Sequence, residues 1–92
     1  MEDKLDTSCT RWITIPNQGL VCVDRIVAVG PASSAAMRRL LGATPLAHVI
    51  GLTGGRKRHS ILVLDSGHVA ITALEVEEIE RLLLHKSLGK TQ

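Results

Sequence analysis

The sequence predicts an α+β domain with a small, largely antiparallel β-sheet and the element order β-β-α-β-β-β-α. Short runs rich in Val and Ile, each bounded by Gly, Pro, Asn or Asp, are typical of strands. Two other segments place aliphatic side chains at helical spacing, which indicates amphipathic helices. A chain of 92 residues is long enough for one such domain.

The first two strands are predicted over residues 11–16 and 20–29, on either side of a turn over residues 17–19. Asp24 and Arg25 interrupt the apolar alternation of the second run. A bulge or bend at this point would re-aim both side chains. A continuous strand whose charged pair faces water is an equally good interpretation.

The first helix is predicted after Ser33 or Ser34, because a serine hydroxyl can accept a hydrogen bond from a free N–H of the first turn. Gly42 and Pro45 close this helix. Its outward residues include Arg38 and Arg39, and its inner stripe is Met37, Leu40 and Leu41.

Three further strands are expected over residues 46–52 and, as a pair turning at Asp65-Ser66-Gly67, over residues 60–74. The strand beginning at Ser60 is apolar on both faces, which favours a central position or contact with another subunit. A second helix is predicted over residues 75–86, with acidic residues in its first turns and basic residues in its last.

These elements predict one domain over residues 11–88, between a flexible tail at 1–10 and a short tail at 89–92. Apolar residues form 45% of the chain but aromatic residues only 1%, so Trp12 is expected to fill the core. A monomer of this size leaves aliphatic surface uncovered, which favours a homo-oligomer. The sequence contains neither a secretion signal nor a membrane-spanning run.

The two cysteines favour a cytoplasmic protein. Cys9 and Cys22 stand 13 positions apart without a C-x-x-C pair, which argues against both a zinc knuckle and a disulfide scaffold. A reducing compartment therefore fits best.

Positive charge is concentrated in the middle of the chain. The net charge is only +2, yet residues 7–74 hold seven basic and two acidic side chains, because the acidic residues gather near the two ends. This asymmetry favours a polyanionic partner.

The sequence offers no catalytic site, metal site or cofactor site. Gly51 to Lys57 lacks the spacing of a phosphate-binding P-loop, and a strand follows it. Asp65, Ser66 and His68 are too close on one turn to act as a triad. The histidines lie on separate elements without ligand spacing. We therefore expect neither an enzyme nor a small-molecule binder.

The strongest local signal is a basic hairpin at the tip between the third and fourth predicted strands. Gly54 and Gly55 allow positive φ and close approach to a ligand, and Arg56, Lys57 and Arg58 supply charge and donors for phosphate. Such contacts give affinity with little sequence information. A solvated turn is as common an explanation for three cations alone, but Arg25, Arg38 and Arg39 would strengthen the binding surface if they shared its side of the sheet.

From about Trp12 to Leu83 the chain resembles the bacterial RemA-like extracellular matrix regulatory proteins. The resemblance lies in VCVDRIVAV, in SSAAMRRLL and, most specifically, in TGGRKRHSILVLDSGHVAITAL, where the glycines, the cations, the aliphatic strand and Asp-Ser-x-His occur in register.

The resemblance implies a DNA-binding regulator of biofilm matrix genes that assembles into a ring and acts at the nucleoid. The family's DNA-contacting arginines fall on Arg25 and Arg56, and its second loop arginine falls on Lys57, which cannot form the bidentate fork of arginine. The family's threonine-arginine pair after the loop arginines becomes Arg58-His59 here, which moves one charge by one residue and is expected to place Arg58 on the opposite strand face. The final helix has Val76 in place of the family's proline.

Two alternatives remain open at this point. The first is an RNA-binding ring, against which the scarcity of aromatic side chains counts, since readers of single-stranded RNA stack bases on such rings. The second is a structural or protein-interaction oligomer whose loop cations have no nucleic-acid role.

Overall fold

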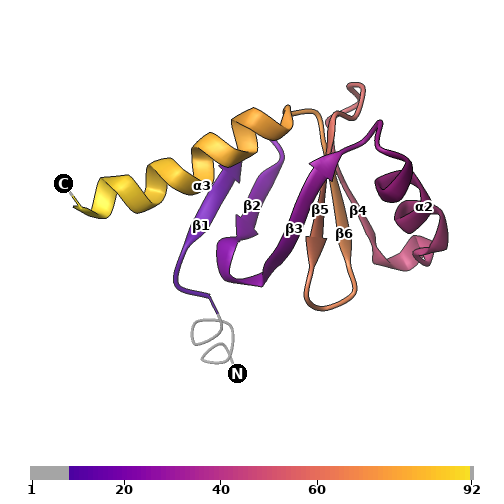
Figure 1. Ribbon diagram of the computed structural model, residues 1–92, viewed down its shortest axis with the longest axis horizontal. Coiled ribbons are helices and arrows are strands. Elements are labelled where there is room, and N and C mark those ends of the chain that lie inside the picture. The colour runs from indigo at the N-terminus through magenta and orange to yellow at the C-terminus, as the bar shows by residue number, and fades with distance from the viewer. Residues whose placement is uncertain (1–8, 92) are drawn as a thin grey trace.

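The computed structural model describes residues 9–91, with side chains described through Leu84. The chain forms an α+β fold with a two-stranded hairpin, a four-stranded sheet and two helices (Figure 1). The sequence prediction of an α+β class with mostly antiparallel pairing is confirmed. Six strands are present where five were predicted.

The first two strands form an antiparallel hairpin. β1 (Trp12–Ile15) pairs with β2 (Gly19–Cys22), so that Trp12 faces Cys22 and Ile15 faces Gly19. Asn17 adopts a φ of 64° in the turn, a conformation that asparagine tolerates well.

The prediction of one strand over residues 20–29 is wrong. A 3-10 turn, η1 (Val23–Arg25), separates β2 from β3 (Ile26–Pro31), and the two strands belong to different sheets. Hydrogen bonds fix this turn: Asp24 Oδ2 accepts from the backbone N–H and the hydroxyl of Thr10, and the carbonyl of Arg25 accepts from the N–H of Asp65. The charged pair therefore marks a break, not a bulge.

The four-stranded sheet has the order β3-β5-β6-β4. β5 (Ser60–Leu64) lies between β3 and β6 (Val69–Thr72) and is antiparallel to both, which confirms its predicted central position. β4 (Val49–Leu52) pairs with β6 in parallel and follows a short 3-10 turn, η2 (Leu46–His48). The parallel pair makes the sheet mixed.

Helix α2 (Ala35–Ala43) carries the chain from β3, at one edge of the sheet, to β4, at the other. The hydroxyl of Ser34 accepts from the N–H of Met37, so the predicted serine cap is confirmed. Met37 packs on Gly30, where a Cβ would lie 2.7 Å from the Met37 methyl group. The predicted inner stripe is therefore only half covered, and no residue of α2 is fully buried.

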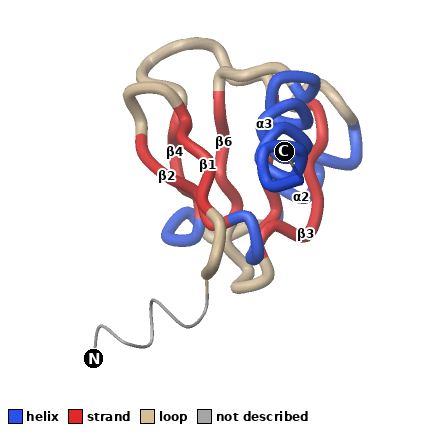
Figure 2. The backbone as a smooth tube through the Cα atoms, turned by 90° about the vertical axis from the view of Figure 1, so that its left-hand side faces the viewer, coloured by secondary structure: helices blue, strands red, loops and turns tan. Residues whose placement is uncertain are grey.

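Helix α3 (Val76–Thr91) begins where the sequence predicts and runs past Lys86. The backbone N–H of Glu75 donates to Oε1 of Glu78 at 2.9 Å, which satisfies a donor that the first turn leaves free. Figure 2 shows α3 end-on beside β1 and β3. In the described part of the chain no helix is long and apolar enough to cross a membrane.

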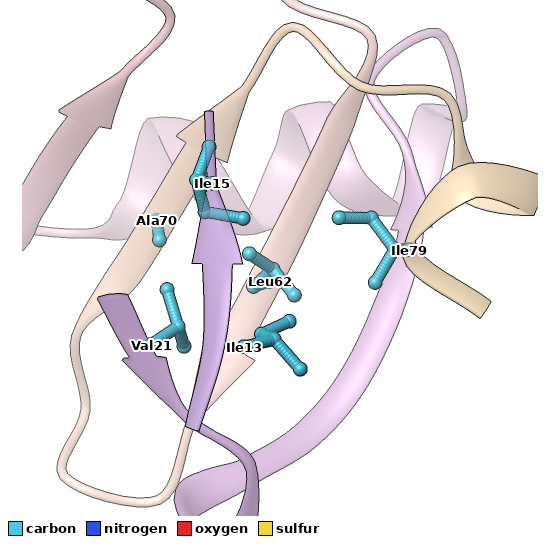
Figure 3. Close-up of a cluster of buried hydrophobic side chains, with 6 residues drawn as sticks. All are labelled: Ile13, Ile15, Val21, Leu62, Ala70 and Ile79. Atoms are coloured by element: carbon cyan, nitrogen blue, oxygen red, sulfur yellow. The ribbon is translucent and has the colours of Figure 1, made fainter. Parts of the chain in front are cut away.

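The hydrophobic core lies between the four-stranded sheet, the hairpin and α3, whereas α2 lies behind the sheet (Figure 3). Its buried residues are Ile13, Ile15, Val21, Leu62, Ala70 and Ile79. Trp12 is not among them. It is 44% exposed, because Ile13 and Ile15 occupy the inward face of β1 and side chains alternate along a strand. The prediction that Trp12 fills the core is therefore wrong.

Candidate nucleic-acid interface

The basic loop, which we define as residues 53–59, is not a hairpin. It connects β4 to β5, but β6 lies between these strands, so the loop crosses the end of β6 (Figure 1). Gly54 and Gly55 have φ values of 64° and 86°, as the predicted loop geometry requires. The N–H of Arg56 donates to the carbonyl of Thr53 at 3.1 Å and closes the turn.

His59 fixes the end of the basic loop to the sheet. Its backbone N–H donates to the carbonyl of Thr72, its carbonyl accepts from the N–H of Ala32, and its Nδ1 lies 3.2 Å from the carbonyl of Ala73. Its Nε2 lies 3.6 Å from a carboxylate oxygen of Glu75. The cations therefore stand on a segment that is held at both ends by regular structure.

Arg56, Lys57 and Arg58 border one shallow hollow of about 400 Å³, together with Gly51 and other residues of the loop and of β6. All three cations are exposed, and none forms an ion pair with a carboxylate of the described side chains. Arg58 was expected on the opposite face, but it precedes β5 and so does not follow the strand alternation. The three charges are free to bind the same anionic partner.

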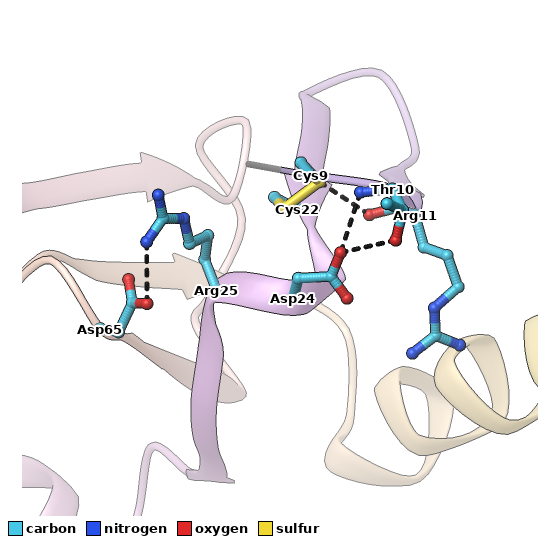
Figure 4. Close-up of a disulfide and its surroundings, with 7 residues drawn as sticks. All are labelled: Cys9, Thr10, Arg11, Cys22, Asp24, Arg25 and Asp65. Carbon is cyan, nitrogen blue, oxygen red and sulfur yellow. Dashed lines mark hydrogen bonds and ion pairs between the residues drawn. A yellow bond between two sulfur atoms is a disulfide. The ribbon is translucent and has the colours of Figure 1, made fainter. Parts of the chain in front are cut away.

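Arg25 lies at the other end of the sheet. Ile26 pairs with Leu64, whereas the basic loop joins Ser60, and a strand of five residues is roughly 16 Å long. Arg25 Nη1 donates to Asp65 Oδ2 at 3.0 Å (Figure 4). Within one chain Arg25 and the basic loop therefore lie at opposite ends of the sheet, so Arg25 does not add to the surface of the loop.

Arg38 and Arg39 lie on α2, which begins at the end of the sheet that carries the basic loop, because Pro31 pairs with Ser60. Both are exposed. They form no ion pair with any carboxylate of the described side chains. These two predicted accessory cations therefore lie closer in the topology to the basic loop than Arg25 does.

The turn over Asp65, Ser66 and His68 is not arranged as a triad. Ser66 Oγ and His68 Nδ1 lie 2.7 Å apart, but Asp65 binds Arg25 instead of orienting the imidazole. The ring of His68 meets that of His48 edge-on, with centroids 4.7 Å apart. These contacts hold the turn between β5 and β6.

Cys9 and Cys22 form a disulfide, so the prediction against one is wrong for this pair (Figure 4). The β1–β2 hairpin sets Cys22 opposite Trp12 and so brings it close to Cys9. The ligand atoms of both cysteines and of Asp24 lie within 4.8 Å of one another, a distance that could suit a metal ion. Here the sulfurs bond to each other and Asp24 binds Thr10, so the group fastens residues 9–10 to the hairpin and η1.

Hydrogen bonding keeps Asp24 ionised. The backbone N–H of Thr10, followed by its hydroxyl, lowers the pKa of Asp24 below its ordinary value of 3.8, and Arg11 and Arg25 add smaller favourable effects. Asp24 therefore keeps its charge while it holds Thr10 in place.

The family model for RemA-like proteins, described as extracellular matrix regulatory protein A-like, matches residues 12–83. The chain belongs to the RemA-like family. The RemA-like match covers Arg25 and the whole basic loop, but Cys9 lies before it. The disulfide therefore joins a residue outside the RemA-like match to one inside it.

Three relatives illustrate how closely the chain resembles other members by sequence. Proteins of Dictyoglomus thermophilum and Dictyoglomus turgidum are 43% and 41% identical over 70 residues, which is 75% of this chain and 82% of each relative. A protein of a Synechococcus strain is 30% identical over 84 residues, or 90% of this chain and 94% of the relative. All three are regulatory proteins by name.

Proposed function

We propose that this protein is a non-enzymatic, DNA-binding transcriptional regulator whose basic loop binds the phosphate backbone of duplex DNA. The observation that carries the proposal is the free positive charge around one hollow: Arg56, Lys57 and Arg58 are exposed and form no ion pair with the described carboxylates. Arginine forks and a lysine ammonium are suited to phosphate oxygens. The RemA-like family and the regulatory names of the relatives support a role in gene control.

The family description supports a target among genes for extracellular matrix, which in a bacterium means biofilm matrix. A regulator of this kind would act at the nucleoid; this location follows from the proposed DNA target alone, because the Cys9–Cys22 disulfide removes the argument from cysteine usage for a reducing compartment. The backbone contacts of the basic loop give affinity, and the shape of the DNA supplies selection among sites, because phosphate contacts carry little sequence information.

We further propose that the active form is a homo-oligomeric ring. Leu46, Val27 and Leu20 are 87%, 65% and 60% exposed, an unusual amount of free aliphatic surface for a small domain. A groove of about 560 Å³ between the hairpin and β4 is lined in part by Trp12, Leu20 and Ile50. A second copy of the chain would cover such surfaces, and association between unlike surfaces forms a ring when the rotation from one subunit to the next closes.

A ring would also make use of Arg25. Each subunit presents the basic loop at one end of its sheet and Arg25 at the other. A ring would present the basic loop and Arg25 of successive subunits along the same stretch of DNA. Several weak contacts would then combine into tighter binding through avidity.

The test measures binding to duplex DNA, hairpin RNA and single strands at several salt concentrations. We expect the duplex to bind most tightly, with log K falling linearly with log salt. Arg56→Ala with Lys57→Ala should flatten that slope by about 2 per engaged subunit, since each lost phosphate contact removes about one unit. Arg81→Ala, which removes one cation from α3, is the control for loss of charge outside the basic loop and should change the slope by less than either single loop substitution.

The proposal is contradicted if the double variant binds duplex DNA with wild-type affinity, or if duplex binding by the wild type does not depend on salt. Preference for hairpin RNA would favour the RNA-binding alternative, and absence of binding to any nucleic acid would favour an interaction scaffold. Light scattering tests the ring separately: a monomer at micromolar concentration removes the avidity argument, and Leu46→Glu should disrupt the assembly if η2 lies in the interface.

A further inference from the structure

The turn of the β1–β2 hairpin lies against the basic loop. Together they enclose a pocket of about 220 Å³. Its walls include Asn17 and Gln18 of the turn, Thr53, Gly54 and Arg56 of the basic loop, and Ala73 and Leu74 from the segment that leads into α3. Sequence reasoning identified residues 17–19 only as a turn, because the contact between the hairpin and the loop spans more than 30 positions of the chain.

Gln18 covers the point at which the loop backbone is left-handed. A Cβ on Gly54 would collide with the amide nitrogen of Gln18 and lie 3.1 Å from its Cδ. Gly54 also has a φ of 64°, which a side chain would strain. The left-handed backbone therefore favours glycine here, and its absent side chain leaves the space that the Gln18 amide occupies.

The lining of this pocket is rich in neutral and cationic donors. The amides of Asn17 and Gln18, the hydroxyl of Thr53 and the guanidinium of Arg56 can all donate hydrogen bonds, and no carboxylate lines the pocket. Its volume lies below the roughly 300 to 1,000 Å³ of sites for drug-sized ligands. The donors suit an anionic group, and the pocket is large enough to admit a phosphate.

We infer that this pocket binds one backbone phosphate of the nucleic acid, with Arg56 and Asn17 as donors and Gln18 as the residue that positions the loop and completes the donor set. The inference rests on the proposed function. It extends the interface from the basic loop to the hairpin turn, and it gives the loop a fixed support that a flexible turn would lack.

The experiment compares Gln18→Glu with Leu84→Glu. Both add one negative charge, but Leu84 is an exposed residue of α3, eight positions past the start of the helix and so roughly 12 Å along it. We expect Gln18→Glu to weaken duplex binding by about tenfold or more and to reduce the salt slope by about 1, whereas Leu84→Glu changes affinity by less than about threefold. Gln18→Ala removes the donor without adding charge and should give an intermediate loss.

Urea unfolding of each variant shows whether the fold is retained, and Gln18→Ala keeps the test valid if the glutamate variant does not fold. Wild-type affinity and slope in both Gln18 variants overturn the inference, while a loss in Arg56→Ala with Lys57→Ala still supports the proposed function. No effect of that double substitution would instead remove the proposed function itself.

Inorganic phosphate serves as the second probe, because the same donors would accept a free anion. Competition by millimolar phosphate that disappears in Gln18→Glu supports a phosphate-sized pocket used by the duplex. Phosphate-induced shifts of the Gln18 side-chain amide in NMR spectra, combined with unchanged duplex affinity of the Gln18 variants, assign the pocket to a free anion and overturn its role in nucleic-acid binding.

Discussion

Arg25 donates through Nη1 to Oδ2 of Asp65 at 3.0 Å, at the end of the four-stranded sheet opposite the basic loop. The two side chains are 48% and 40% exposed, so water screens the pair and its contribution to stability is at most about 1 kcal/mol. In the proposed DNA complex, a phosphate would therefore compete with this carboxylate for Arg25 at little cost to the fold.

Asp65→Asn should therefore tighten duplex binding. If the phosphate replaces a pair worth up to about 1 kcal/mol, affinity rises by up to about fivefold, and the free energy of unfolding changes by less than about 1 kcal/mol. Fluorescence anisotropy with a labelled duplex and urea titration measure the two quantities. Arg25→Ala is the companion variant: if neither it nor Asp65→Asn alters affinity, Arg25 does not contact DNA.

Lys57→Arg should also strengthen binding. Lysine offers a point charge, whereas arginine presents a planar fork that can bind two phosphate oxygens at once, and Lys57 borders the same hollow as Arg56 and Arg58. We expect a gain of about 1 kcal/mol, or about fivefold in affinity, with an unchanged salt slope because the charge is the same. Arg56→Lys should produce the opposite change. Equal affinities for all three proteins would show that charge alone matters in this loop.

The sequence predicts the parts of this fold that depend on neighbouring residues. The turn over Asp65-Ser66-Gly67 and the Ser34 cap have local chemical signals, and both occur as predicted, with Gly67 at a φ of 92°. The sequence does not predict the features that depend on pairing between distant segments, such as the order of the strands. β4 lies beside β6 instead of β5, and this choice makes the basic loop a crossing segment.

The candidate site divides in the same way. Glycines followed by cations identify Arg56, Lys57 and Arg58 without any knowledge of the fold. The position of Arg25 at the far end depends on η1, which forms because Thr10 and Asp65 bind its residues from other elements. Gln18 has no local signal at all, since its role depends on the contact between the hairpin and the loop.

A buried pair of hydroxyls supports the start of β5, next to the basic loop. Ser60 Oγ and Thr72 Oγ1 lie 2.6 Å apart and both residues are fully buried. Thr72 Oγ1 also accepts from the N–H of Leu74 at 3.1 Å. Thr72→Val should therefore cost about 2 to 3 kcal/mol of unfolding free energy, because it leaves the buried Ser60 hydroxyl and the half-buried N–H of Leu74 without this partner, while Ser60→Ala should cost about 1 kcal/mol.

Urea unfolding of the two single variants and the double variant tests this assignment. The double variant should cost less than the two single costs added, since removal of the Ser60 hydroxyl relieves the group that Thr72→Val leaves unpaired. Additive costs would mean that the two hydroxyls do not interact.

Reduction of the disulfide should lower the stability of the hairpin. Cys9 and Cys22 are separated by 13 positions. A disulfide that closes a loop of this length stabilises the folded state by about 3 kcal/mol, because it reduces the conformational entropy of the unfolded chain. Urea titration with and without a thiol reductant measures the difference. The double variant Cys9→Ala with Cys22→Ala is the control. Its urea midpoint should equal that of the reduced wild type and should not change when the reductant is added. A wild-type midpoint that does not respond would contradict a bond between these residues.

Acid should remove the stabilisation that Asp24 provides. Hydrogen bonds from Thr10 lower the pKa of Asp24 in the folded state below its ordinary value of 3.8, so the unfolded chain takes up the proton first as pH falls. The stabilisation is therefore complete above about pH 5 and is lost as pH falls through 3.8 toward the lower folded pKa.

The variant Asp24→Asn lacks this stabilisation, so the wild type and the variant should differ in unfolding free energy at neutral pH and converge in acid. Thr10→Val removes the hydroxyl donor but keeps the N–H, so its pH dependence should lie between them in urea titrations across this range. Parallel curves for wild type and Asp24→Asn down to about pH 2.5 would rule out the hydrogen-bonded carboxylate as the cause.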